Sequence, residues 1–248
     1  GKTSVKDLTG FCLDKLDKTY YSKNSFNNKY GVPLSIINSP QSTKFSVLEV
    51  GMDKKGEIDT LTKLIRPNLG LITNISYAHI KNFKNLDEIA KAKGEIINNI
   101  SPSGVMIVNK DDKYCNYFIS KAKMRNLNII TFSKKNKLAD VVYLGERKNR
   151  NKFLCKFLIN GKIKFFLIPD YLIDFKENIL STLSIIVNYF NIDALPTNLF
   201  LNFKISQSRG TIIRYKNGKK NITIIDESYN SNPLSFKFAL DRFDKNYK

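Results

Sequence analysis

The stretch VMIVNKDDKYCNYFISKAKMRNLNIITF, residues 105–132, decides the fold class of this chain. Residues 105–108 and 128–132 are short apolar runs of the kind found in buried strands, and residues 111–124 between them are expected to form a helix. Strands that alternate with helices are typical of a parallel sheet whose two faces are covered by helices. The stretch therefore predicts an α/β fold.

The same alternation continues on the N-terminal side of this stretch. We predict strands at residues 45–50 and 69–75, and helices at residues 4–16, 60–65 and 86–100. The second of these helices should stop before Pro67, because proline lacks the amide hydrogen that a helix interior needs. Residues 1–132 thus predict a mainly parallel sheet.

The pattern changes after residue 140. Residues 141–168 read as short strands joined by turns, with Asn160-Gly161 as a hairpin signal, and they predict an antiparallel annex. A helix is expected at residues 175–190, and a further hairpin at residues 211–215 and 222–225. We predict one α/β domain with an antiparallel annex, whose last residues begin another domain.

Composition limits the possible functions only weakly. The 248 residues carry a formal net charge of +19, which permits a polyanionic partner. The lysines are scattered along the whole chain, however, and basic runs such as 148–152 sit beside turn residues. No apolar run is long enough to span a membrane. The three cysteines are widely spaced, which favours reduced intracellular thiols over a disulfide framework or a zinc site.

The first four residues, GKTS, resemble the second half of the phosphate-binding loop G-x-x-x-x-G-K-[ST], whose first glycine would precede residue 1. In such a loop the backbone amides at a helix N-terminus hold phosphate. Lys2 would neutralise the β and γ oxygens, and the Thr3 hydroxyl would bind Mg²⁺. The alternative is a chance tripeptide. The loop predicts that the parallel sheet is of the P-loop, mononucleotide-binding kind.

Polar residues follow three of the predicted strands. Glu49 ends the run 45–50, His79 follows the strand 69–75, and Asp226 and Glu227 follow the strand 222–225. Ligands gather at the carboxyl edge of an open parallel sheet, so these side chains and Lys93 on the helix 86–100 are candidates for a site. Each also has an ordinary interpretation: a solvated carboxylate, a structural histidine, a surface lysine or a turn.

Together these segments resemble the Mur ligases, over nearly the whole chain. Each motif is short, but their common order is specific. The matching segments are GKTS (1–4), NSFNNKYGVP (24–33), VLEVGMDKKGEI (47–58), RPNLGLITNISYAHIKNF (66–83), EIAKAKGEI (88–96), VNKDD (108–112) and DESYNSNP (226–233).

The resemblance implies an ATP-dependent amide-bond ligase. Similarity to the family elements NN-x-IGVP and YNANP points to the member that adds D-alanyl-D-alanine to UDP-N-acetylmuramoyl-tripeptide in peptidoglycan precursor synthesis. ATP would convert the terminal carboxylate of the tripeptide to an acyl phosphate, which the amine of D-alanyl-D-alanine attacks. The protein's part is to position the reactants and neutralise the transferring phosphoryl group. A cytoplasmic monomer with no nucleic-acid partner and no membrane insertion is implied as well.

The resemblance also implies roles for single residues. The implied catalytic residues are Glu49, His79 and Lys93. The implied nucleotide contacts are Gly1, Lys2, Thr3, Ser4, Asn178, Arg209 and Glu227. The implied contacts to the muramoyl-peptide substrate or to the C-terminal domain are Asn27, Asn28, Tyr229, Asn230 and Asn232. Two Mg²⁺ ions are implied, with Thr3 and Glu49 on one, His79 on the other, and Lys93 as an anionic ligand after CO₂ has converted it to a carbamate. That reaction needs a neutral amine, so a lowered pKa of Lys93 is its precondition.

On this interpretation residues 1–232 are the central ATP-binding domain, beginning inside its phosphate loop, and residues 233–248 begin the C-terminal domain. The first sheet strand, the domain that grips the uridine nucleotide and most of the C-terminal domain would lie outside the sequence. We therefore expect the 248 residues alone to be inactive.

The sequence departs from the family pattern at a few positions. Ser181 stands where a second asparagine commonly follows Asn178, and Glu227 replaces an aspartate. Asn24 and Ser25 replace a Gly-Asn pair, and Ser208 replaces a glycine. Two alternatives therefore stay open: a sibling Mur or folylpolyglutamate-type ligase, and a non-catalytic basic module that binds nucleotides or nucleic acid.

Overall fold

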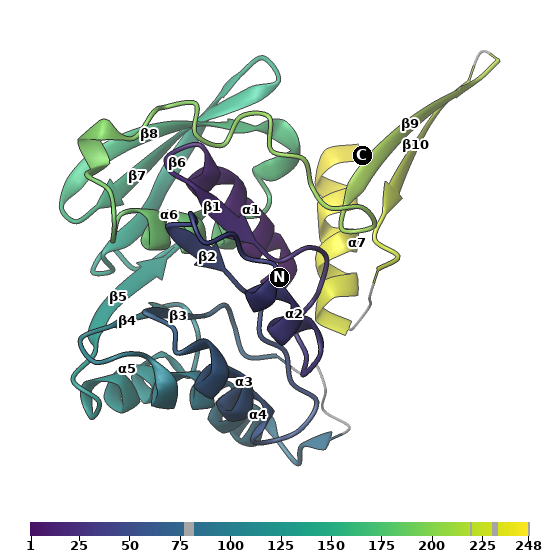
Figure 1. The fold of residues 1–248 in the computed structure, drawn as a ribbon. Helices are drawn as coiled ribbons and strands as arrows, with labels where there is room; N and C mark the ends of the chain where they lie inside the picture. Colours follow the sequence, from purple (N-terminus) through teal and green to yellow (C-terminus); the bar gives the residue numbers. More distant parts are fainter. Residues whose placement is uncertain (77–81, 219, 230–232, 248) are drawn as a thin grey trace.

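The computed structural model describes residues 1–76, 82–218, 220–229 and 233–247 (Figure 1). Its centre is a six-stranded sheet in the order β3-β4-β5-β6-β7-β8. The parallel part consists of β3 (Leu69–Ile72), β4 (Val105–Asn109), β5 (Asn128–Ser133) and the first residues of β6 (Val141–Asn149). This confirms the predicted α/β class.

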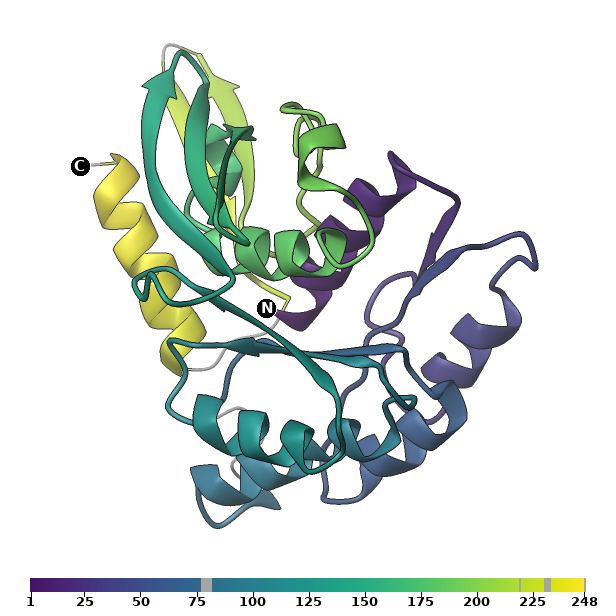
Figure 2. The ribbon, with the colours of Figure 1, turned by 90° about the vertical axis from the view of Figure 1, so that its left-hand side faces the viewer.

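Alternating side chains of β4 build a core on each face of the sheet. Val105 and Ile107 join the cluster that contains α1 (Lys2–Asp14) and α6 (Lys176–Ile186), whereas Met106 and Val108 pack with α5 (Cys115–Lys123). All five residues of β4 are buried, as expected for a central parallel strand. Figure 2 shows the two layers, with α1 and α6 above the sheet and α3 (Glu57–Ile65), α4 (Leu86–Lys93) and α5 below it.

A second, two-stranded parallel sheet pairs β1 (Thr19–Tyr21) with β2 (Phe45–Val47). Among the described residues it forms no ladder with the larger sheet. A cavity of about 780 Å³ is lined by β2, β3 and α1. α1 lies close against β1, because a Cβ on Gly10 would come within 2.2 Å of the ring of Tyr21. The short helix α2 (Gly31–Ile37) follows β1.

The antiparallel annex is continuous with the parallel sheet. β6 pairs parallel with β5 through Val141 and Val142, and then antiparallel with β7 (Lys152–Ile159), which pairs with β8 (Lys162–Pro169). The three strands have 8 or 9 residues each, so they are longer than the short strands expected from the sequence.

The last part of the chain is a separate hairpin of β9 (Thr211–Asn217) and β10 (Lys220–Asp226), followed by α7 (Pro233–Tyr247). Before it, the 3-10 turns Asp170–Leu172 and Ile192–Ala194 and an irregular stretch complete the core around Leu199 and Phe200, which are fully buried. None of the helices in the described ranges is long and apolar enough to cross a membrane.

Several predicted elements differ from the structure in their bounds. The helix expected over 86–100 is α-helical only to Lys93 and continues as a 3-10 helix over Gly94–Asn99, because glycine is a poor helix residue. The expected strand 45–50 pairs only over its first three residues, since its partner β1 ends at Tyr21. The sequence analysis did not predict β1 and α2.

Candidate functional site

The GKTS segment lies at a helix N-terminus, as predicted. α1 begins at Lys2 with Gly1 as its N-cap, so the amides of the first turn point away from the helix. The helix forms because Val5, Leu8 and Cys12 present one buried face to the core. Thr3 is buried, whereas Lys2 is exposed and lines the large cavity. This end of α1 can accept an anion.

Glu49 lies just past β2 and is 5 % exposed. Its Oε1 accepts a hydrogen bond of 2.7 Å from Asn27 Nδ2, and the carbonyl of Asn27 accepts one from the Gly51 amide, also at 2.7 Å. Oε2 is buried and has no hydrogen-bond partner among the described residues. A buried carboxylate oxygen without a partner is costly. It is therefore suited to a cation.

Lys93 is the last residue of α4, and its Nζ donates to the carbonyl of Asn74 at 2.7 Å. The pKa of Lys93 is lowered to about 8, mainly by burial and further by the positive charge of Lys2, while Asp112 opposes the shift. A lowered pKa gives this amine a substantial neutral fraction near pH 8. This is the direction of pKa shift that the resemblance implied for carbamate formation.

The large cavity brings three predicted residues together, because Lys2, Glu49 and Lys93 all line it. They come from α1, the segment after β2 and the end of α4. The sequence alone placed each of them on a different predicted element. Their common cavity shows that these ends converge.

Ser25 connects a second group of predicted residues. Its hydroxyl lies 3.1 Å from Thr3 Oγ1, accepts from Arg209 Nη2 at 2.9 Å, and accepts from the Tyr229 hydroxyl at 2.7 Å. The guanidinium of Arg209 also stacks on the Tyr229 ring, 3.7 Å from its centroid. Since a serine hydroxyl has one proton and two acceptor positions, these contacts leave Thr3 as the acceptor of its proton. In the sequence, Ser25 stood out only as a departure from the family pattern.

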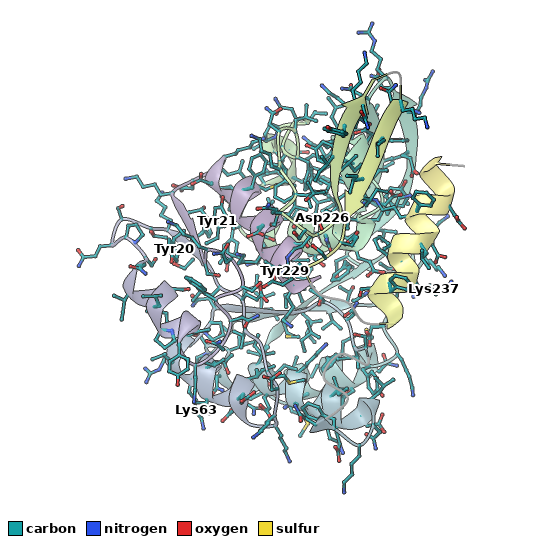
Figure 3. All side chains as sticks on the ribbon, turned by 90° about the vertical axis from the view of Figure 1, so that its right-hand side faces the viewer. Tyr20, Tyr21, Lys63, Asp226, Tyr229 and Lys237 are labelled. Atoms are coloured by element: carbon teal, nitrogen blue, oxygen red, sulfur yellow. The ribbon has the colours of Figure 1, made fainter. Side chains whose placement is uncertain are left out.

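The segment after β10 contacts this group through Tyr229, which is labelled together with Asp226 in Figure 3. Asp226 accepts from Ser208 Oγ at 2.9 Å, and the Tyr229 amide donates to the Ser208 carbonyl at 3.1 Å. Hydrogen bonds from Ser228 and Ser208 hold the pKa of Asp226 below its usual range. Tyr229 and Arg209 thereby reach the N-terminus of α1 from the far end of the chain.

Glu227 lies beside a buried arginine. Burial raises its pKa, and the nearby guanidinium of Arg242 works against that rise. The Arg242 guanidinium lies 3.7 Å from Glu227 and 3.4 Å from Asp174, and Arg242 is 5 % exposed. No periodicity or motif in the sequence indicated that a residue of α7 would be buried here.

The other predicted residues fall in different places. Ser4 and Asn178 line the same small cavity of about 10 Å³ between α1 and α6. Asn28 Oδ1 accepts from the amides of Tyr30 and Gly31 at the start of α2, which is a helix-capping role. His79, Asn230 and Asn232 lie outside the described residues.

The fit of Mg²⁺ rests on the observed donor set. The described part of the chain holds no cluster of three His, Cys, Asp or Glu side chains. Thr3 and Glu49 nonetheless offer the oxygen ligands that Mg²⁺ prefers, and one Glu49 oxygen is buried without a partner. The residues present fit a cation at Glu49.

The helix N-terminus, the lysines and the carboxylate around one cavity define a phosphate-binding α/β protein. Residues 1–182 match the Mur ligase middle domain, and the chain belongs to the Mur ligase family.

Relatives and solved structures agree with this assignment. The chain is 30 % identical over 242 residues to the UDP-N-acetylmuramoyl-tripeptide–D-alanyl-D-alanine ligase of Rickettsia prowazekii, covering 97 % of this chain and 53 % of that protein. A crystal structure of MurF from Acinetobacter baumannii superposes with a TM-score of 0.87 at 24 % identity, over 99 % of this chain and 52 % of the other. MurF from Thermotoga maritima in complex with ADP gives 0.76 at 21 % identity, over 97 % of this chain and 54 % of the other. The chain thus spans about half the length of the relatives it matches.

Proposed function

We propose that this chain is the ATP-binding part of a ligase that joins D-alanyl-D-alanine to UDP-N-acetylmuramoyl-tripeptide. The observation that carries the proposal is the cavity at the N-terminus of α1, which Lys2, Glu49 and Lys93 line together. The names of the relatives give the substrates, and the Thermotoga maritima structure with bound ADP supports the nucleotide.

The chain's own residues supply charge and position. A carboxylate is a poor electrophile until phosphorylation gives it a good leaving group, so the site must hold two anions close together. Lys2 and the first amides of α1 offset the charge of the ATP phosphates. Arg209, held by Ser25 and stacked on Tyr229, supplies a second fixed cation next to Thr3. Fixed cations need no reorganisation during the reaction.

Glu49 and Lys93 are the residues that would hold metal ions. Thr3 and Glu49 would bind one Mg²⁺, and Lys93 as a carbamate would bind Mg²⁺ together with His79, a residue outside the described ranges. Bound Mg²⁺ would neutralise phosphate oxygens and orient them for transfer. Asn27 keeps the Glu49 carboxylate in place from its other oxygen.

We also propose the domain arrangement expected from the sequence, with residues 1–232 as the central domain and 233–248 as the start of the next. The whole enzyme would be a cytoplasmic monomer. The chain covers about half the length of each relative, which supports a longer protein. The cavity beside β2 and β3 supports a further strand there.

Phosphate release by the full-length enzyme tests the function. The assay contains ATP, Mg²⁺, UDP-N-acetylmuramoyl-tripeptide and D-alanyl-D-alanine, and each substrate is omitted in turn. We expect release that needs both substrates and is lost in Lys93→Ala. Release driven by another amino acid would move the protein to a sibling or folylpolyglutamate-type ligase. No release with any combination would favour a non-catalytic nucleotide- or nucleic-acid-binding module.

A further inference from the structure

The turn after β4, Asn109-Lys110-Asp111-Asp112, has a role that the proposed function does not use. β4 lies between β3 and β5 in the sheet. Asn109 Oδ1 accepts from the Asp111 amide at 3.0 Å, which sets the turn. The turn thus presents two adjacent carboxylates at the carboxyl edge of the sheet.

The two carboxylates accept hydrogen bonds from segments on the two sides of β4. Asp111 accepts from the Ser133 hydroxyl and from the Lys134 amide at 2.7 Å, so it fixes the end of β5. Asp112 Oδ2 accepts from the Ile75 amide at 2.8 Å, so it fixes the segment after β3. The two aspartates offer a matched control, because both anchor a segment but only Asp112 binds the segment that contacts Lys93.

The Ile75 amide belongs to the same peptide group as the carbonyl that Lys93 binds. Lys93 Nζ donates to the Asn74 carbonyl at 2.7 Å, and the N–H on the other side of that peptide bond donates to Asp112. A peptide group is planar and rigid, so fixing its N–H fixes the direction of its carbonyl. A carboxylate on the N–H also strengthens the carbonyl as an acceptor.

The helix that carries Lys93 is tied to the same turn. Asp112 Oδ1 accepts from the Tyr114 amide at 2.8 Å, and the Tyr114 hydroxyl donates to Asp87, in the first turn of α4, at 2.5 Å. The turn therefore contacts both the helix of Lys93 and the peptide group that Lys93 binds.

We propose that Asp112 is a positioning residue for Lys93 and acts through the peptide group between Asn74 and Ile75. Its importance for ligation rests on the proposed function, whereas the structural linkage does not. Asp112 is not among the residues that line the cavity; it sets where the Lys93 amine lies.

Hydrogen–deuterium exchange on the full-length enzyme tests the linkage directly. In Asp112→Ala we expect the Ile75 amide to exchange roughly 10-fold faster or more, because it loses its acceptor. The acylation rate of Lys93, measured by mass spectrometry relative to Lys91, should rise as well. Asp111→Ala should leave both rates unchanged and instead release the Lys134 amide. Asp112→Asn keeps one oxygen acceptor in place of two, so it should retain the fold and give an intermediate exchange rate.

The ligase assay then gives the functional consequence. In Asp112→Ala we expect kcat to fall about 100-fold, with KM for ATP nearly unchanged, as for a misplaced reactive group. Asp111→Ala should keep kcat. Unchanged exchange at Ile75 in both Asp112 variants, or equal effects of Asp111→Ala, overturns the proposal. Suppose that the wild-type enzyme shows no ligation while Asp112→Ala, unlike Asp111→Ala, speeds both the exchange of the Ile75 amide and the acylation of Lys93. In that case the proposed function fails and the structural linkage stands.

Discussion

Lys93 is one of the charged residues that line the cavity, and its protonation state changes the net charge there. Its side chain is half-buried near the positive charge of Lys2, and both effects favour the neutral form, while Asp112 favours the charged form. Burial is the largest of these contributions. The residue is therefore poised between an ammonium, which binds the Asn74 carbonyl, and a nucleophilic amine, which can react with CO₂.

We predict that the reactivity of Lys93 has a midpoint near pH 8. The pKa of Lys93 is lowered to about 8, so the neutral amine is half populated there and dominates above it. The rate of acylation of Lys93 against pH, followed by peptide mass spectrometry, measures this midpoint. Lys2→Ala should move the midpoint to higher pH, because it removes a repelling charge. A midpoint above about pH 10, that of an ordinary lysine, would contradict the burial argument.

The same shift has a consequence for stability, with a definite sign. A lysine whose folded pKa lies below its unfolded value penalises the folded state at low pH. As pH rises from about 8 toward the unfolded value, the unfolded chain still binds the proton that the folded chain has lost, so this group's contribution to stability rises. Denaturation curves of Lys93→Met should lack that component of the pH dependence.

We predict that Ser25→Ala loosens the group around Thr3. The substitution removes three contacts and leaves the buried Thr3 hydroxyl without its donor, which costs about 1–3 kcal/mol. KM for ATP in the full-length enzyme should rise, because Arg209 loses its anchor. Ser39→Ala removes one exposed serine–serine hydrogen bond and is the matched control. Equal effects of both substitutions would rule out the role of Ser25.

At this scale the sequence predicted types of residue better than their partners. The GKTS motif at a helix N-terminus and Glu49 at the end of an apolar run followed from local patterns, whereas the need for a lowered Lys93 pKa came only from the resemblance to the Mur ligases. The contacts of Ser25 with Arg209 and Tyr229 bridge 184 and 204 residues, and no local periodicity contains such information. The roles assigned to all the site residues remain predictions, and His79, Asn230 and Asn232 lie outside the described residues.

At the scale of elements, α7 packs against the rest of the chain through the buried Arg242 and through Phe238, whose ring centroid lies 5.7 Å from that of Phe175. Arg242 contacts Asp174 and Glu227 and stacks near the Phe175 ring, whereas four apolar residues of α7 remain exposed: Phe236, Phe238, Leu240 and Phe243. Gly210, with φ of +90°, passes so close that a Cβ there would lie 2.6 Å from the Arg242 guanidinium. Arg242 thus packs directly against the segment that leads into the hairpin.

We predict that Arg242→Ala destabilises the chain by about 3–5 kcal/mol, because it leaves the nearby carboxylates without their buried partner. Lys237→Ala breaks an exposed ion pair with Asp241 on the same helix and should cost less than about 1 kcal/mol. Urea denaturation of both variants gives the comparison. Similar midpoints for the two would show that Arg242 does not dock α7.

Element types followed from hydrophobic periodicity, but their ends did not. The strand–helix–strand unit at 105–132 is present. However, α5 starts only at Cys115, because Asp111 and Asp112 belong to the turn that precedes it. β1 has only three residues, all half-buried, and its strand state depends on pairing with β2. Such an element has no pattern of its own to detect.

At the scale of the whole molecule, a cavity of about 780 Å³ lies between β2, β3 and α1. Its lining is mixed: Val47, Leu69 and Leu71 contribute apolar side chains, and polar residues such as Ser46 and Thr73 lie among them. The apolar residues of β2 and β3 can pack against a further strand.

We predict that a chain extended before Gly1 by a complete phosphate-binding loop and an apolar strand melts at a higher temperature. Burying two aliphatic side chains contributes about 3 kcal/mol or more, which corresponds to a rise in Tm of roughly 6 °C or more for a domain of this size. An extension of equal length made of Gly and Ser is the control. Equal melting temperatures for the two extensions would show that the cavity does not take up a strand.

The shared strand β6 also has a consequence for how the molecule comes apart. Because β6 pairs with β5 on one side and β7 on the other, and because one apolar cluster runs from α1 through Val141 and Phe166 to Phe200, the annex has no boundary at which it could separate. Heating should therefore melt the parallel and antiparallel regions in a single cooperative transition, and a protease that cuts in the annex should release no stable remnant of the nucleotide site.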